Sequence, residues 1–276
     1  MARAAAIVAT FLSRYAAANP SPMTVVLAVL FLVTAALYAA VGFGGGSTYN
    51  ALLVLNDVDY RLLPSIALLC NIIVVAGGVH RLASIGAVSP RRLAPFVLAS
   101  VPAAAIGGLA PISETAFVGL LGGALLIAGL QLAFERPTED RATPPAATRP
   151  LLAAGVGGGI GLLSGLVGIG GGIFLAPILY AMKWDAPRAI AGACSVFILV
   201  NSVAGLAGQL VKLGDLRALG ALSAYWMAFP AVLIGGQIGS RLVSVGLAPT
   251  IIKRLTAVLI LFVAARLLFR WASAIA

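Results

Sequence analysis

The sequence is poor in charge. Charged residues make up 9% of its 276 residues, whereas ordinary globular chains carry about a quarter. Hydrophobic residues make up 61%, so a cytosolic enzyme is excluded. A helix rises about 1.5 Å per residue and needs about 20 residues to cross the hydrocarbon core of a bilayer. The length therefore allows at most about ten crossings, and we predict a multi-pass membrane protein.

Acidic residues, histidine and cysteine are also scarce. Cys70 and Cys194 lie inside apolar stretches, which indicates small buried thiols rather than a disulfide framework or a metal site. Proton relays and metal-ion pathways in membranes usually contain buried Asp, Glu or His. The single histidine, His80, ends an apolar stretch, and all eight acids fall in predicted loops or a linker: Asp57, Asp59, Glu114, Glu135, Glu139, Asp140, Asp185 and Asp215. A cation antiporter or a transition-metal importer would therefore lack its expected residues, and we expect no metal site and no cofactor.

Basic residues outnumber acidic ones, 18 to 8, which gives a formal net charge of +10. Nucleic-acid binding needs such cations gathered on a water-exposed face, but here they are scattered between apolar stretches. We attribute the excess of basic residues to the positive-inside rule, by which cytoplasmic loops of membrane proteins are rich in Lys and Arg, and to basic side chains that reach the interface from helix ends. No nucleic-acid partner is expected.

Apolar stretches occur in two sets of similar order. We divide the chain into an N-terminal segment (1–22), a first transmembrane repeat (23–134), a polar linker (135–150) and a second transmembrane repeat (151–276). The N-terminal segment has a basic start and a short apolar run, and we expect a retained interfacial helix rather than a cleaved signal peptide. The linker holds three Arg, three acids and four Pro, a composition too polar for the membrane. The expected fold is an all-α, polytopic membrane helical bundle.

Three landmarks recur in the same order in both halves. The run Gly44–Gly46 recurs 126 residues later as Gly170–Gly172, and Asn71 recurs 130 residues later as Asn201. The third landmark, Val101–Ala103, corresponds to Phe229–Ala231, 128 residues later. Internal repeats of this kind occur in many transporter folds. We therefore predict two homologous repeats, each with a glycine-broken helix.

The relative orientation of the repeats depends on how the broken helices are counted. The apolar stretches before and after each glycine run form a pair. If such a pair counts as one crossing, the repeats are parallel and the N-terminus is inside, with 12 basic residues inside and 6 outside. If each pair is two crossings, the repeats are inverted, the N-terminus is outside, and the division is 11 to 7. The positive-inside rule slightly favours the parallel arrangement.

Two runs of three glycines interrupt membrane-compatible stretches. Successive glycines have high backbone entropy and adopt positive φ readily, so a helix is expected to stop at each run. Broken backbone at membrane depth survives only where protein buries it or where it lines an aqueous cavity. Breaks at corresponding positions of two halves predict a substrate site, here composed of Gly44, Gly45, Gly46, Gly170, Gly171 and Gly172.

Neutral polar residues complete the predicted site. Ser47 and Thr48 are residues common at helix starts, so the free N–H groups of the segment that they begin are expected to face the first break and to favour an anion. Further side chains at membrane depth are Asn50, Asn71, Ser195 and Asn201. A buried amide needs a partner, either a ligand or a neighbouring helix, and the sequence leaves both open for Asn71 and Asn201.

Other glycines and two glutamines indicate helix packing. Residues with small-xxx-small spacing let helices approach closely, and they include Gly157, Gly161, Gly165, Gly235 and Gly239. Interhelical hydrogen bonds are the favoured interpretation for Gln209 and Gln237.

Enzymatic function is not supported. An intramembrane serine protease needs a G-x-S-G serine and a histidine, and Gly161–Gly165 has a different spacing. A nucleotide-binding glycine loop needs a preceding β-strand, which a membrane-spanning stretch excludes.

The glycine-rich blocks resemble a known family. Both G-x-G-G-G blocks, the continuation Gly170–Pro177 and the segment Asn201–Gly205 are similar to the sulfite exporter TauE/SafE family, also called the toluene sulfonate uptake permease family. The resemblance spans both halves. It implies a multi-pass permease of the cell (inner) membrane for sulfite or other small sulfur-containing anions, such as thiosulfate, sulfoacetate or organosulfonates. The first half departs from the pattern because Ala51 stands at the position of Pro177, so the two halves of the site are not expected to be equivalent.

The resulting hypothesis is a permease that holds its anion with the backbone amides of both breaks and with neutral Ser, Thr and Asn donors. Outward passage of an anion from an inside-negative cell gains about 2.3 kcal/mol per charge per 100 mV, without a coupling ion. The alternatives are a transporter or channel for another small anion or metabolite, and a structural membrane protein without transport. The expected partners are the anion and the lipid bilayer, while transport direction, coupling and oligomeric state stay open.

Overall fold

The computed structural model describes residues 22–40, 42–84, 86–134, 149–214, 222–242 and 249–275. Within these ranges the chain is helical and has no strands. The helices are α2 (Pro22–Ala39), α3 (Gly46–Leu55), α4 (Leu63–Ser84), α5 (Pro90–Leu109), α6 (Glu114–Phe134), α7 (Pro150–Val167), α8 (Gly172–Ala181), α9 (Pro187–Leu213), a 3-10 turn η1 (Ser223–Tyr225), α11 (Ala228–Leu242) and α12 (Pro249–Ile275). The prediction of an all-α fold is confirmed. The N-terminal segment and the polar linker lie almost entirely outside the described residues.

Several of these helices have the length and composition of membrane spans. Six qualify among the described residues: Leu63–Ser84, Pro90–Leu109, Glu114–Phe134, Pro150–Val167, Arg188–Leu213 and Ala257–Ile275. Large apolar side chains on their outer faces are exposed, as at Leu98, Phe134 and Leu151. Contiguous apolar surface on such helices is suited to contact with lipid. The chain is a multi-pass membrane protein.

Closely packed glycines join helices of the two halves. A Cβ at Gly157, Gly161 or Gly165 of α7 would overlap the main chain of α5 at Phe96, Ser100 and Ala104. The same contact recurs between α11 and α2, where Gly235 and Gly239 lie on Leu32 and Ala36. The packing role predicted for these spaced glycines is confirmed. In both pairs the residue numbers rise together, so the paired helices run parallel.

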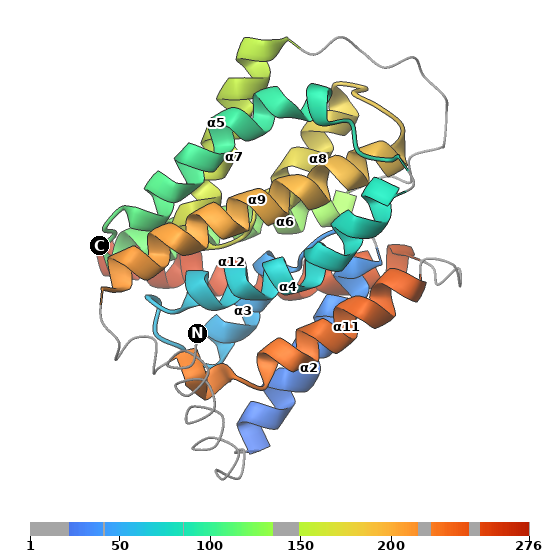
Figure 1. Ribbon diagram of the computed structural model, residues 1–276. Helices are drawn as coiled ribbons and strands as arrows, with labels where there is room; N and C mark the ends of the chain where they lie inside the picture. The colour runs from blue at the N-terminus through green and yellow to red at the C-terminus, as the bar shows by residue number, and fades with distance from the viewer. Residues whose placement is uncertain are drawn as a thin grey trace, which may run out of the picture.

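Helices α6 and α12, the last of each half, run antiparallel. The contacts of three glycines on α6 show this, because Gly119 meets Trp271, Gly122 meets Leu268 and Gly129 meets Leu261. Figure 1 shows the same relation for α4 and α9, which lie side by side in the centre of the bundle. Helices at corresponding positions of parallel repeats would run in the same direction. The packing therefore favours the inverted arrangement over the parallel one that the charge count slightly favours.

The backbone around the two breaks is similar, although Gly170 has a positive φ of +87° and its counterpart Gly44 does not. Positive φ angles recur 126 residues apart: +82° at Gly42 and +79° at Gly168, +89° at Gly45 and +82° at Gly171, and +51° at Asp57 and +49° at Lys183. Asp57 and Lys183 are the non-glycine residues with positive φ in the described part of the chain. Each break is thus followed by a short helix and by a loop of the same local shape.

Charged contacts define the two ends of the bundle. At one end, the α3–α4 end, Arg270 of α12 pairs with Glu114 of α6, with 2.7 Å between Nη2 and Oε1. At the opposite end, the α8–α9 end, Arg92 at the start of α5 pairs with Asp185. The two glycine breaks lie between these ends.

Candidate functional site

The two glycine breaks meet in the interior around Asn71 of α4, which is completely buried. A Cβ at Gly46 or at Gly170 would lie 2.6 Å from Asn71 Nδ2, and one at Gly44 would overlap the same amide. At Gly46 it would also lie 2.6 Å from the carbonyl oxygen of Ile169 in the second break. Glycine runs that are far apart in the sequence are thus brought together around one side chain.

Side chains donate hydrogen bonds to the backbone carbonyl groups of the breaks. Asn71 Nδ2 donates to Ile169 O at 3.2 Å, and Asn50 Nδ2 donates to Val167 O at 2.8 Å. Ser195 Oγ, on α9, donates to Gly42 O at 2.6 Å. The last carbonyl groups of a helix have no partner within it, so these bonds satisfy acceptors that would otherwise face the site. They also reduce the negative potential that the carbonyl groups would present to an anion.

Backbone amides, by contrast, begin both short helices without side-chain caps. Gly45 and Gly171 are the N-cap residues, and neither short helix has a side-chain cap hydrogen bond. The first amide that donates to the Gly45 carbonyl is that of Tyr49, and the first that donates to the Gly171 carbonyl is that of Phe174. The amides of residues 46–48 and 172–173, which come before them, therefore have no acceptor within their own helices. Such an array of N–H groups at the positive end of a helix dipole is suited to an anion.

The hydroxyl groups of Ser47 and Thr48 have a different role from the one expected. Helix α3 begins one residue earlier, at Gly46, with Gly45 as its cap. Thr48 Oγ1 lies 2.8 Å from the hydroxyl of Tyr38 and Ser47 Oγ lies 3.5 Å from it. These contacts join α3 to α2, and the backbone N–H groups of Ser47 and Thr48 are what the residues offer at the break.

Asn201 is not hydrogen-bonded to either break among the described contacts. Its Nδ2 donates to Phe197 O in the same helix at 2.8 Å. Of the two glutamines, Gln209 makes the predicted interhelical bond, since Nε2 donates to Gly165 O at 2.7 Å. Gln237 is exposed.

Two buried hydroxyl groups beside the breaks were missed in the sequence. A Cβ added at Gly45 would lie 3.1 Å from the hydroxyl of Tyr49, and one added at Gly170 would lie 3.3 Å from Ser202 Oγ. Both residues are completely buried, and neither hydroxyl has a partner among the described residues. Each can donate to a ligand. A signal existed for Tyr49, because Leu175 occupies the corresponding position of the second half.

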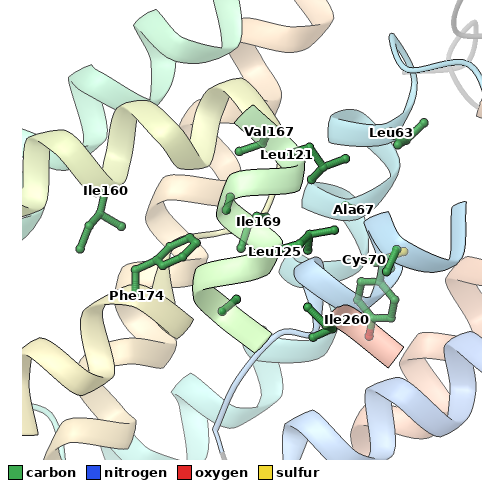
Figure 2. Close-up of a cluster of buried hydrophobic side chains, with 14 of the residues drawn as sticks. Leu63, Ala67, Cys70, Leu121, Leu125, Ile160, Val167, Ile169, Phe174 and Ile260 are labelled. Carbon is green, nitrogen blue, oxygen red and sulfur yellow. The ribbon is translucent and has the colours of Figure 1, made fainter. Parts of the chain in front are cut away.

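Apolar side chains surround the breaks. Figure 2 shows Val167 and Ile169, on either side of Gly168, within the same packed interior as Leu121 and Leu125 of α6. Cys70 is buried in this interior as a free thiol, and Cys194 is also free and buried, as predicted for both. No charged residue occurs in 41–55 or 167–182. A ligand at the breaks would meet neutral donors and apolar side chains.

Comparisons with known proteins point to transport. Residues 26–267 match the family described as sulfite exporter TauE/SafE. The chain is also 34% identical over 246 residues to the "probable membrane transporter protein y4hK" of Sinorhizobium fredii (strain NBRC 101917 / NGR234), an alignment that covers 88% of this chain and 97% of that protein. No solved structure matches the chain.

Proposed function

The chain belongs to the sulfite exporter TauE/SafE family of membrane transporters, and from this premise we propose that it is a permease for small sulfur-containing anions. Sulfite, thiosulfate, sulfoacetate and other organosulfonates form the substrate class. The chain is a transporter of the cell membrane, not an enzyme. What remains to be assigned is how the anion is bound.

The proposed site is the junction of the two breaks. The observation that carries it is the convergence of Gly44, Gly46 and Gly170 on the Asn71 amide. The free amides of residues 46–48 and 172–173 are the main donors. Asn50, Asn71 and Ser195 occupy the competing carbonyl groups and so position the breaks, and the hydroxyl groups of Tyr49 and Ser202 are additional donors. Asn201, whose Nδ2 donates within α9, is not part of this proposed donor set.

The absence of a countercharge favours release as well as binding. Charge-assisted contacts to Lys or Arg are roughly twice as strong as hydrogen bonds from neutral donors, and a fixed cation at the centre of the pathway would retain the anion. Neutral amides bind more weakly. A permease benefits from this balance, because its ligand must leave the site on the other side.

We also propose that residues 23–134 and 151–276 are inverted repeats. The antiparallel packing of α6 with α12 and the φ angles that recur 126 residues apart support this arrangement. In the inverted count, 11 basic residues lie inside and 7 outside, so the positive-inside rule places the α3–α4 end outside the cell. We refer to it below as the outer end.

Flux through liposomes tests the site. Purified protein should release trapped sulfite or methanesulfonate, and Gly171→Leu should stop this release. A Cβ at Gly171 would meet Ile160 Cγ2 at 2.8 Å and Phe197 Cε1 at 2.9 Å, at a residue with positive φ.

The matched control is Gly159→Leu, which makes the same change on α7 at an exposed glycine with nothing within 4 Å. We expect it to retain wild-type flux. Equal flux in wild type and both variants would reject the site, whereas a wild-type protein that releases another small anion but no sulfur-containing one would reject the substrate class.

A further inference from the structure

We propose that the outer end contains a second anion site, a vestibule in which the substrate docks before it reaches the glycine breaks. The residues that define this outer vestibule are Arg61, Pro64, Gln209 and Lys212. The inference rests on the proposed anion transport. It adds a docking site at the outer end, and this site has cationic residues that the glycine breaks lack.

The vestibule is a cavity of about 530 Å³. Its walls come from the loop before α4, the loop between α5 and α6, and the last turn of α9. A second cavity of about 520 Å³ adjoins it, and the two linings share Asp59, Tyr60, Arg61 and Phe117. The vestibule is larger than a small anion requires, so an anion can enter with part of its hydration shell.

The charges of the vestibule favour an anion. Its ionisable lining residues include Arg61, Lys212 and Asp59, so cations exceed carboxylates by one. Arg61 Nε donates to the hydroxyl of Tyr60 at 3.4 Å, and an arginine guanidinium stays protonated in proteins. Lys212 Nζ lies 3.5 Å from Ala110 O, and an ammonium group has three donors.

The adjoining cavity has the opposite balance. Its two arginines, Arg61 and Arg270, lie with three carboxylates, those of Asp57, Asp59 and Glu114. One of these arginines, Arg270, is already paired with Glu114. An anion at the outer end is therefore attracted to the side that contains Lys212.

The floor of the vestibule reaches the second break. Gln209 lines the cavity, is completely buried, and donates to Gly165 O at the end of α7. Its Oε1 has no partner among the described residues, which leaves a polar acceptor for water or for the protonated group of a ligand. Pro64, also in the lining, contacts Gly168. The lining of the vestibule thus reaches both the last turn of α7 and Gly168, where the second break begins.

The corresponding loop at the other end is filled. Asp57 and Lys183 give both loops the same turn, and the residue after each differs: Val58 lines the adjoining outer cavity, whereas Trp184 is completely buried. The guanidinium carbon of Arg92 lies 4.5 Å from the centre of the Trp184 ring, and Arg92 also pairs with Asp185. The docking site therefore belongs to the outer end.

Sided transport kinetics test the vestibule. In right-side-out and inside-out vesicles, Lys212→Gln should raise the KM for methanesulfonate supplied at the outer face about fivefold, which corresponds to the loss of about 1 kcal/mol of a partly exposed ionic contact. The maximal rate of transport from the outer face should not change. Lys212→Arg should restore the outer KM, because it keeps the positive charge.

The control is Arg188→Gln, at the exposed inner end of the same helix, which should leave the outer KM unchanged. If the wild type transports methanesulfonate and Lys212→Gln does not alter the outer KM, the vestibule is rejected and the central site stands. A wild-type protein that moves no small anion rejects the proposed function itself.

Discussion

At the glycine breaks, side-chain amides bond main-chain carbonyl groups rather than standing free. Asn50 and Asn71 are such residues, and each donates across the boundary between the two halves of the chain. The sequence indicated which residues are polar at membrane depth, because each interrupts an apolar stretch. Their partners were not predictable, since the direction of an amide depends on tertiary contacts that one sequence does not contain.

Asn71→Ala should reduce both stability and flux. It leaves the buried Ile169 carbonyl without its donor, a loss of about 1–3 kcal/mol, and it lets the second break change shape. Thermal unfolding in detergent and liposome flux measure the two effects. Asn201→Ala is the comparison, because Asn201 bonds only its own helix among the described contacts, and its flux should fall less. A larger loss of flux in Asn201→Ala than in Asn71→Ala would contradict the central position of Asn71.

Gly161→Leu should destabilise the bundle without acting on the breaks directly. The new side chain would overlap the main chain of α5 at Ser100, and overpacking typically costs about 1–3 kcal/mol. Lower thermal stability and less folded protein in detergent are expected. Gly159→Leu, two residues away on the exposed face, should behave like wild type, and equal stability of the two variants would show that α5 and α7 do not pack through this glycine.

Among the elements, the helices were predictable because apolar stretches of membrane length are a strong signal. The sequence has an apolar stretch at 62–79, where α4 forms, and one at 247–269, where α12 forms, and the ends differ by up to six residues. Helix direction was not predictable in the same way. It depends on whether the short segment after each break returns toward its starting side, and the sparse charges at the helix ends do not determine this.

A double cysteine variant tests helix direction. A Cβ at Gly122 of α6 would lie 3.2 Å from Leu267 Cβ of α12, close to the Cβ separation of a disulfide, about 3.5–4.5 Å. We expect Gly122→Cys with Leu267→Cys to form an intramolecular disulfide on mild oxidation, visible as a mass loss of two hydrogen atoms, whose electrons pass to the oxidant. Gly122→Cys with Leu261→Cys is the control, because Leu261 contacts Gly129 instead. Cross-linking in the control and not in the first pair would contradict the antiparallel packing.

For the whole molecule, the scarcity of charge sets the environment and is the basis of the proposed selectivity. The acids lie outside the predicted spans, and the buried polar residues in the described part of the chain carry amides and hydroxyl groups. The sequence was sufficient to place the chain in a membrane and to locate the two breaks. It was insufficient to show that the breaks meet, or that cavities occur at the outer end, because both depend on how α4 and α9 cross.

Singly charged anions should be transported faster than doubly charged ones. The cost of transferring an ion into a medium of low dielectric constant grows with the square of its charge, about fourfold from a monoanion to a dianion, and no charged residue of 41–55 or 167–182 offsets it. Sulfite flux should therefore fall as the pH rises and hydrogensulfite loses its proton. Methanesulfonate, singly charged throughout, serves as the control and should show no such fall; a parallel fall for both would assign the pH effect to the protein.

The central claim is that backbone amides of the two breaks bind the anion, and amide NMR tests it most directly. In protein labelled with 15N-glycine, we expect methanesulfonate to shift the amide resonances of Gly46 and Gly172. The resonances of Gly155 and Gly159, which face open space on α7, should stay in place. Saturable transport of methanesulfonate with unchanged resonances at both breaks would contradict the claim.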